Sequence, residues 1–432
     1  MKKRVFLPAA VLLCAIAVII ASATSRRSRP VSPDRTESVL ETVRLNDTLN
    51  NGMSDIPELV PMDQAIQKFL KRWEIKGASL AIMKNDSLVY AKGYGWADLE
   101  DSVRMEPGNI LRMASVSKLI TATGIMSLKE KGLISLQDTV FGPGKLLDDS
   151  LYTKSVRDRR IFKITVEQLL RHKGGFTTGH GDPMFSSQDM IRQFRLDGAP
   201  DSRTLVSCEL TRWLGFTPGT SQQYSNFGYL LLSLIIEKIT GEPYEQYITR
   251  EILAPAGCYD MHIARNYYED RYPNEVKYYM QSGSVPCEEY NLSGRMVEKC
   301  YGGSNITGLS GAGAWVGSPA ELCRFVASID GDDTIPDILS KESIAEMTEY
   351  FDPQTFSLGW NDTKPDGEWT RTGTLSGTSA LVKRYPDGEC WIMITNTGTY
   401  RGPYFSKYVS TLFRRCREAY SRYLPDYNLF GS

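Results

Sequence analysis

The segment Met113-Ala114-Ser115-Val116-Ser117-Lys118-Leu119-Ile120-Thr121-Ala122 contains a serine and a lysine three residues apart. If the segment is a helix that begins near Ser115, Lys118 lies one turn further along the same face and its amine can reach the serine hydroxyl. Backbone N–H groups and the positive dipole end at a helix start favour a serine alkoxide. A lysine accepts a proton near pH 7 only if burial or a neighbouring cation lowers its pKa. The pattern therefore predicts a nucleophile and a base in a closed pocket.

A Ser-x-x-Lys pattern alone is weak support, because a chain of this length contains roughly one or two by chance. This sequence contains one. The plainer interpretation is an exposed serine at a helix start, followed by a solvated lysine. The apolar neighbours Leu111, Met113 and Leu119 indicate instead that the helix is buried, where a lysine needs a specific role.

Composition limits the classes of function. The chain has 432 residues, of which 41% are hydrophobic, enough for one large domain of two lobes or for two or three small domains. Fifty basic and 51 acidic residues leave no basic face for a nucleic acid, so we expect no nucleic-acid partner. The three histidines (His172, His180 and His262) are not spaced as a metal pair, and we expect no metal and no cofactor. His172 ends an apparent helix, which is more typical of a structural histidine than of a catalytic triad.

The N-terminus carries an export pattern. Basic residues at positions 2–4 precede an apolar run over residues 5–23 that ends in Ala21-Ser22-Ala23, which predicts a signal peptide over residues 1–23 and an exported, periplasmic or envelope-associated protein. The run is also long enough for an uncleaved membrane anchor. Residues 24–59 are polar and predict a flexible linker, residues 60–425 the folded domain, and residues 426–432 a tail.

The cysteines predict neither a disulfide scaffold nor a zinc site. Without Cys14 in the leader, seven remain, an odd number with no Cys-x-x-Cys motif. Cys287 and Cys300 flank a polar loop and form the one candidate disulfide. The loop stretch 287–291 and a second polar stretch, 179–182, are candidates for walls of a cleft.

Hydrophobic periodicity predicts an α+β fold. Helices are expected at residues 61–73, 165–171, 227–240 and 404–420, and strands at 78–83, 87–94, 368–372, 379–385 and 390–395. Strands from both ends of the chain would pair into one antiparallel sheet covered by the terminal helices. The sheet lobe would comprise about 60–114 and 305–425, with a helical lobe of about 115–304 inserted between its strands and the active site between the lobes. The polar stretch 176–219 is expected to be a long loop over the rim of the pocket.

A second motif, Tyr224-Ser225-Asn226, follows a turn signal and precedes an apolar helix. The tyrosine can place a phenol beside Lys118, and the Asn226 amide can bind both the lysine and a substrate carbonyl. A phenolate is reasonable only where cations depress its pKa well below ~10. By itself the triplet is better explained as a simple cap of the following helix.

A third motif, Arg371-Thr372-Gly373-Thr374, ends a predicted strand. An arginine here can bind a carboxylate with two parallel hydrogen bonds. Gly373 lets a substrate backbone approach closely, and the Thr374 N–H can join the Ser115 N–H in an oxyanion hole. As a lone motif, the segment is also an ordinary turn after a strand.

In chain order, Ser-x-x-Lys, Tyr-x-Asn and a basic-Thr-Gly strand resemble the motif set of the serine β-lactamase and penicillin-binding-protein superfamily. The Tyr-x-Asn form is similar to the class C branch, which also includes D,D-peptidases, D-aminopeptidases and esterases. The resemblance covers about residues 62–412, and the segments 169–175, 311–322 and 358–360 support it. It implies a β-lactamase/transpeptidase-like fold and a reaction without a metal.

The resemblance also implies roles. Ser115 would be the acylated nucleophile, and Lys118 and Tyr224 would transfer protons. The substrate would be bound by the remaining motif residues, Asn226, Arg371, Thr372, Gly373 and Thr374. The family has lysine or histidine where this chain has Arg371, which keeps the charge but cannot release a proton. We therefore expect carboxylate recognition rather than efficient β-lactam hydrolysis.

These patterns lead to one main hypothesis and two alternatives. The main hypothesis is an exported serine hydrolase that forms an acyl-enzyme with a small peptide, amide or ester, carrying a carboxylate and derived from the cell wall. One alternative is a β-lactamase or carboxylesterase of the same family. The other is a protein that binds peptidoglycan peptides without turnover. Contact with a membrane is expected only if the N-terminal segment stays uncleaved.

Overall fold

The computed structural model describes residues 44–352 and 354–431. Contacts divide the chain into residues 1–42 and one compact unit that contains all the described residues. The predicted signal peptide or anchor at 1–23 lies outside the described residues. Among the residues that are described, no helix is both long enough and apolar enough to cross a bilayer.

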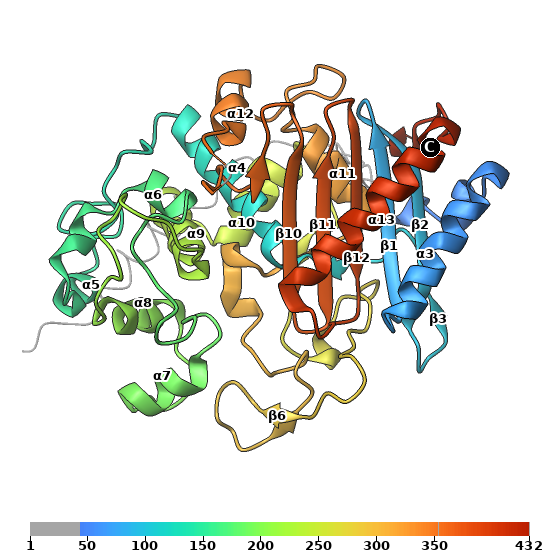
Figure 1. Ribbon diagram of the computed structural model, residues 1–432. Helices are drawn as coiled ribbons and strands as arrows, with labels where there is room; N and C mark the ends of the chain where they lie inside the picture. Colours follow the sequence, from blue (N-terminus) through green and yellow to red (C-terminus); the bar gives the residue numbers. More distant parts are fainter. Residues whose placement is uncertain (1–43, 353, 432) are drawn as a thin grey trace, which may run out of the picture. The chain divides into compact units, whose positions relative to one another are not determined.

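A seven-stranded antiparallel sheet forms one half of this unit (Figure 1). Its strand order is β3-β2-β1-β12-β11-β10-β9. The strands are β1 Gly77–Lys84, β2 Ser87–Asp98, β3 Val103–Arg104, β9 Asp362–Thr363, β10 Trp369–Leu375, β11 Thr378–Arg384 and β12 Glu389–Thr395. The pairing of β1 with β12, from Ala78 opposite Thr395 to Lys84 opposite Glu389, joins the two ends of the chain. The predicted single antiparallel sheet is therefore confirmed.

Both faces of the strands β1, β11 and β12 are buried, and alternate residues of these strands serve different cores. On β12, Trp391 and Met393 pack beneath α3 (Val60–Arg72) and α13 (Phe405–Tyr420), which lie side by side across one face (Figure 1). Ile392 and Ile394 point to the opposite face and join the larger core. This alternation follows from the two-residue period of a strand. It explains why β12 is apolar at every position between Cys390 and Ile394.

Further helices cover the opposite face of the sheet and its upper edge. They are α11 Pro319–Ala327 and α12 Lys341–Thr348. The described residues also form two small sheets. One has the order β4-β8-β5, formed by Leu111–Arg112, Trp315–Gly317 and His262–Ile263, and the other pairs β6 Cys287–Glu288 with β7 Met296–Val297. The three-stranded sheet matters for function because β4 leads directly into Ser115.

A helical lobe forms the other half of the unit. Its helices are α4 Ser117–Glu130, α5 Ser150–Ser155, α6 Val166–Leu170, α7 Ser187–Phe194, α8 Ser202–Leu210, α9 Asn226–Thr240 and α10 Tyr244–Ile248. A capping box between Thr165 and Gln168 begins α6, and Gly241, with φ +73°, ends α9. All of residues 117–128 of α4 are buried, so this helix is the centre of the fold.

Three sequence expectations need correction. The stretch 176–219 is not one long loop, because it contains α7 and α8; each has at most nine residues, too few for a clear apolar stripe. The flexible linker predicted to residue 59 is wrong from residue 44 onward. There α2 (Leu45–Thr48) and two 3₁₀ helices pack on the unit, and Leu45, Leu49 and Leu59 are buried.

The third correction concerns the Cys287–Cys300 disulfide. All seven cysteines of the described residues are free thiols. The buried Cys300 Sγ lies 3.6 Å from the carbonyl oxygen of Tyr278, whereas Cys287 is partly exposed and lies against Gly303. The two sulfur atoms therefore have separate neighbours.

Candidate active site

Ser115 lies in a 3₁₀ turn, Ala114–Val116, between β4 and α4, rather than at the first α-helical residue. Ala114 adopts φ +51°, a left-handed conformation that costs a non-glycine residue about 1–3 kcal/mol. The surrounding structure holds it there. The Ser117 hydroxyl donates to the Ala114 carbonyl at 2.6 Å and accepts from the Trp315 N–H at 3.1 Å. The strained turn thus presents Ser115 at the floor of a pocket.

Lys118 is fully buried behind this serine. Its ammonium donates to Ser115 Oγ at 3.3 Å, to Asn226 Oδ1 at 2.7 Å and to the carbonyl oxygen of Ala312. Burial lowers the pKa of Lys118 to about 8; the cation of Arg371 adds to this effect, while Tyr224 opposes it. A useful fraction of Lys118 is therefore neutral near physiological pH.

Tyr224 completes the contact with the serine, since its Oη lies 2.7 Å from Ser115 Oγ. Arg371 Nη2 donates to the same phenol oxygen at 3.2 Å. Burial by itself raises the pKa of a phenol, but the charges of Lys118 and Arg371 outweigh burial and lower the pKa of Tyr224 to about 8. Two groups that can exchange a proton near neutral pH thus flank one hydroxyl.

His172 packs behind Tyr224, and no hydrogen bond joins its side chain to Ser115. The two ring centroids are 4.4 Å apart, and His172 Nδ1 accepts the backbone N–H of Ser225 at 3.1 Å. Burial, together with the cations Lys118 and Arg371, holds the pKa of His172 well below its usual value. The imidazole is therefore neutral and fixes the position of the Tyr224 loop.

Asn226 connects Lys118 to an acidic residue that the sequence left without a role. Its Oδ1 accepts from Lys118, and its Nδ2 donates to Asp182 Oδ2 at 2.7 Å. Asp182 thereby fixes the orientation of the amide. Because an amide NH₂ carries two hydrogens, Asn226 retains one donor for a substrate.

Arg371 does not lie where the sequence interpretation placed it. Its side chain is fully buried, its Nε donates to the Ser115 carbonyl at 2.8 Å, and its Nη1 has no hydrogen-bond partner among the described residues. Arg371 shares a face of β10 with Gly373, and this face packs on the Ser115 turn. The predicted carboxylate clamp is therefore wrong, because the guanidinium lies under the serine.

Gly373 allows β10 to pass directly against this turn. A Cβ there would lie 2.2 Å from the Met113 carbonyl oxygen and 3.1 Å from the Ser115 nitrogen. Leu375 pairs with Thr378 across a two-residue hairpin, and hydrogen-bonded and open pairs alternate in such a ladder. The Thr374 N–H consequently points away from β11. It can bind a developing oxyanion together with the Ser115 N–H.

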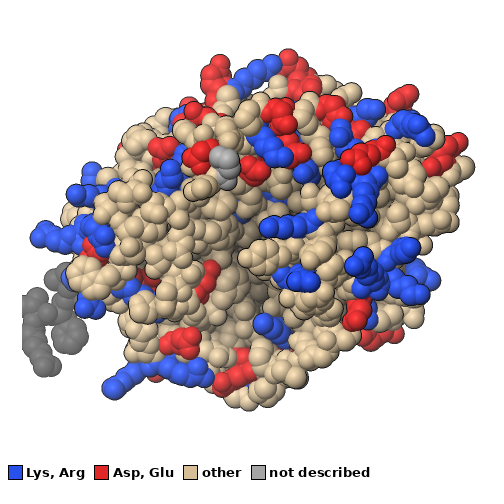
Figure 2. Space-filling model, in the orientation of Figure 1, with Lys and Arg blue, Asp and Glu red and all other residues tan. Residues whose placement is uncertain are grey.

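A cavity of about 360 Å³ opens above Ser115. It is lined by Ser115, Phe185, Tyr224, Asn226, Leu309, Ala312, Gly313, Asn361, Thr372, Thr374, Leu375 and Pro403. Figure 2 shows a hollow at the centre of this face of the molecule. The sequence interpretation missed Phe185 and Asn361. Asn361 accepts both the Thr372 N–H at 2.7 Å and its hydroxyl at 3.1 Å, and directly follows the supporting segment 358–360.

Comparison with known proteins identifies the family. The sequence profile of the Beta-lactamase family matches residues 62–407. The chain belongs to the Beta-lactamase family. A curated relative, "Penicillin-binding protein 4*" of Bacillus subtilis (strain 168), is 26% identical over 332 residues, which cover 73% of this chain and 67% of that protein. Membership of this family and the grouping of Ser115, Lys118 and Tyr224 support a hydrolase that uses a serine.

Solved structures confirm the α+β fold of the Beta-lactamase family. D-amino acid amidase from Ochrobactrum anthropi SV3 superposes with a TM-score of 0.63 at 21% identity, covering 84% of this chain and 99% of that one. The octameric penicillin-binding protein homologue from Pyrococcus abyssi superposes with a TM-score of 0.58 at 22% identity, covering 82% and 76%. At these identities, the likeness establishes the fold.

Proposed function

We propose that this member of the Beta-lactamase family is a serine hydrolase that forms an acyl-enzyme on Ser115. One observation carries the proposal: Ser115 Oγ lies 3.3 Å from Lys118 Nζ and 2.7 Å from Tyr224 Oη, and both of these groups have a pKa lowered to about 8. Perturbed pKa values on both sides of a nucleophile in a pocket are typical of catalysis.

In acylation, Ser115 Oγ attacks the substrate carbonyl carbon while its proton passes to the Tyr224 phenolate. Lys118 and Arg371 stabilise this phenolate before the transfer. The N–H groups of Ser115 and Thr374 bind the oxyanion. Tyr224 then returns the proton to the leaving nitrogen or oxygen, the scissile bond breaks, and an ester to Ser115 remains.

In deacylation, a water molecule takes the place of the leaving group. Tyr224 accepts its proton as the oxygen attacks the ester carbon, and Ser115 leaves with that proton. The polar groups of Asn226 and Thr372 face the same cavity and can hold the substrate near Ser115. No other reactant is required.

The proposed substrates are small peptides, amides or esters, including peptides derived from the cell wall. The names of the relatives, a penicillin-binding protein and a D-amino acid amidase, support this range. The export pattern of the N-terminal sequence supports action outside the cytoplasm. Arginine at the lysine position of the third motif argues against efficient β-lactam hydrolysis as the main activity. The alternative of a pure binding protein does not account for a buried lysine and tyrosine with lowered pKa values.

The test combines labelling with turnover. A fluorophosphonate and a fluorescent penicillin are reacted with wild type and Ser115→Ala, and the adduct is located by mass spectrometry. We expect an adduct on Ser115 only. Turnover is then measured with nitrocefin, p-nitrophenyl esters and D-Ala-D-Ala peptides, and Ser115→Ala should lose about 10³-fold or more with every accepted substrate. Full turnover by the alanine variant would refute the proposal.

A further inference from the structure

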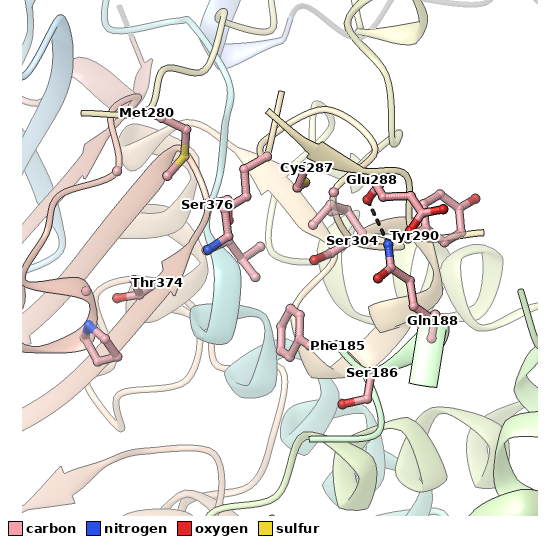
Figure 3. A pocket seen from close by; sticks show the side chains of 18 of the residues that line it. Phe185, Ser186, Gln188, Met280, Cys287, Glu288, Tyr290, Ser304, Thr374 and Ser376 are labelled. Carbon is pink, nitrogen blue, oxygen red and sulfur yellow. Dashed lines mark hydrogen bonds between the residues drawn. The ribbon is translucent and has the colours of Figure 1, made fainter. Parts of the chain in front are cut away.

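A second and larger cavity, of about 620 Å³, adjoins the catalytic one. Phe185, Thr374, Leu375 and Pro403 line both cavities, so the two lie side by side. In Figure 3, Thr374 and Ser376 lie on one side of the space, and Phe185, Ser186 and Ser304 lie across from them. A substrate that is acylated at Ser115 and runs along the end of β10 must enter this second cavity.

The charges in this second cavity are unequal. Lys299 is the only lysine or arginine among the described residues that line either cavity. The two acidic lining residues, Asp189 and Glu288, both face Arg192, whose guanidinium nitrogens lie 3.7 Å and 3.3 Å from their carboxylate oxygens. Lys299 has no carboxylate within ion-pair distance in the described part of the chain. Lys299 is therefore the one cation that lines the extended cleft in the described part of the chain, and it is free of an ion pair, whereas the two carboxylates share the guanidinium of Arg192.

The backbone beneath Lys299 is firmly held. The neighbouring Cys300 carbonyl accepts from Nη1 of the fully buried Arg112 at 2.7 Å, and the Tyr301 N–H donates to the Glu298 carbonyl at 2.8 Å. The lysine thus extends from a fixed turn, and its ammonium remains free to bind a ligand.

The wall that carries Lys299 is also fixed to the helical lobe. Gln188 on α7 donates to the carbonyl oxygen of Glu288 at 2.9 Å (Figure 3). It also donates to the carbonyl oxygen of Glu289 at 3.0 Å. Hydroxyl groups of Ser304, Thr374 and Ser376 line the same space and can serve as further donors. The cavity combines one free cation with several hydroxyls, which is the donor set that a carboxylate requires.

We propose that Lys299 binds a carboxylate on the part of the substrate that runs along Thr374 to Ser376. The proposal rests on the proposed function, because the position of the carboxylate is counted from the carbonyl attacked by Ser115. Ser376 is the first residue of the hairpin turn, two residues beyond Thr374, so the carboxylate is several bonds away from the scissile one. Lys299 thus has the role of binding a substrate carboxylate, which the sequence interpretation assigned to the buried Arg371.

The test measures binding without turnover. Full-length protein with Ser115→Ala is titrated with two D-Ala-D-Ala peptides that are identical except for a carboxylate or a carboxamide on the N-terminal side of the scissile bond. We expect the carboxylate peptide to bind about tenfold more tightly, and the preference to shrink as salt is added. Adding Lys299→Gln should reduce the ratio of the two affinities to near one, whereas Lys299→Arg should preserve it. Lys145→Met removes an exposed lysine that lines neither cavity and should also preserve the ratio.

Two outcomes overturn the assignment: no preference in the parent protein, or a preference that survives Lys299→Gln. Fluorophosphonate labelling of the protein with Ser115 intact tests the acyl-enzyme separately. A labelled Ser115 without a charge preference refutes the role of Lys299 alone. A preference that depends on Lys299, with no label on Ser115, refutes the acyl-enzyme and leaves the binding site in place.

Discussion

Three ionisable side chains share the small volume behind Ser115, and their charges determine which can act as a base. Lys118 and Arg371 bring two positive charges to the Tyr224 phenol, and either cation gains from a phenolate between them. A neutral Lys118 next to a neutral phenol and an ammonium next to a phenolate hold the same number of protons and differ only in which of the two groups carries one of them. The pair therefore titrates as a unit, and an apparent pKa belongs to both groups.

This coupling makes a prediction about pH. The base form of the pair is needed to take the Ser115 proton, so the rate of acylation should rise with pH and level off above the pKa of about 8. The rate of fluorophosphonate labelling between pH 6 and 10 measures this directly, because it reports acylation alone. A rate that is constant from pH 6 to 9, or that falls over this range, would contradict the assignment of Lys118 and Tyr224.

Arg371 should act on that pH profile rather than on substrate affinity. Arg371→Gln removes a cation that lowers the pKa of both Lys118 and Tyr224, so the profile should move to higher pH, and the rate at pH 7 should fall roughly tenfold for each unit of displacement. Arg371→Lys keeps the charge and should move the profile much less. If Arg371→Gln instead raises KM for carboxylate substrates alone and leaves the pH profile unchanged, Arg371 binds the substrate carboxylate and does not act by lowering the pKa values of Lys118 and Tyr224.

At the scale of residues, the sequence interpretation found side chains by their chemistry but could not tell their direction. The structure brings together Ser115, Lys118, Tyr224 and Asn226. The direction of Arg371 depends on which face of β10 packs on the Ser115 turn, and a strand motif does not specify that face. Asp182 contributes one hydrogen bond from a polar loop, a contact that leaves no pattern in the sequence.

At the scale of elements, the contact between β10 and the Ser115 turn controls the oxyanion hole. Gly373→Ala would place a methyl group against the Met113 carbonyl, and neither backbone can yield without moving the strand. We expect kcat to fall about 10²–10³-fold, the usual effect of losing one oxyanion donor, with a smaller loss of stability.

Gly198→Ala is the matched control for Gly373→Ala, because a Cβ at Gly198 meets nothing within 4 Å. Steady-state kinetics and thermal unfolding of both variants decide the matter. If Gly373→Ala turns over substrate as fast as Gly198→Ala does, the Thr374 N–H is not an oxyanion donor.

The elements themselves were predictable where local signals were strong. The capping box at Thr165 and the glycine at position 241 mark α6 and α9, and the turn residues at 85–86 mark the first hairpin with positive φ at both positions. The helices α7 and α8 are too short for a hydrophobic pattern of comparable strength. Their burial depends on neighbours that are distant in the sequence, so tertiary packing decides them.

At the scale of the whole molecule, the folded unit begins earlier than the family profile does. The profile starts at residue 62, yet residues 44–59 pack on the unit. The Asn46 side chain donates to Asp260 Oδ2 at 2.9 Å and accepts from the Ser318 hydroxyl at 2.6 Å, and both partners are buried. The segment therefore joins a loop of the helical lobe to the start of α11, which lies behind the sheet.

Removing this segment should weaken the whole unit rather than a single edge. A chain that begins at residue 60 loses the burial of Leu45, Leu49 and Leu59, each worth about 1.5–3 kcal/mol, and leaves Asp260 and Ser318 without the Asn46 amide. We expect the chain that begins at residue 60 to unfold at a clearly lower urea concentration than a chain that begins at residue 44. The buried polar groups of Asp260 and Ser318, which lose their partner, add to the effect of the lost burial. Asn46→Ala in the longer chain should reproduce part of the loss, and the exposed Asn50→Ala should not. Equal midpoints for the two truncations would mean that residues 44–59 only lie on the unit, and the domain would then start where the family profile does.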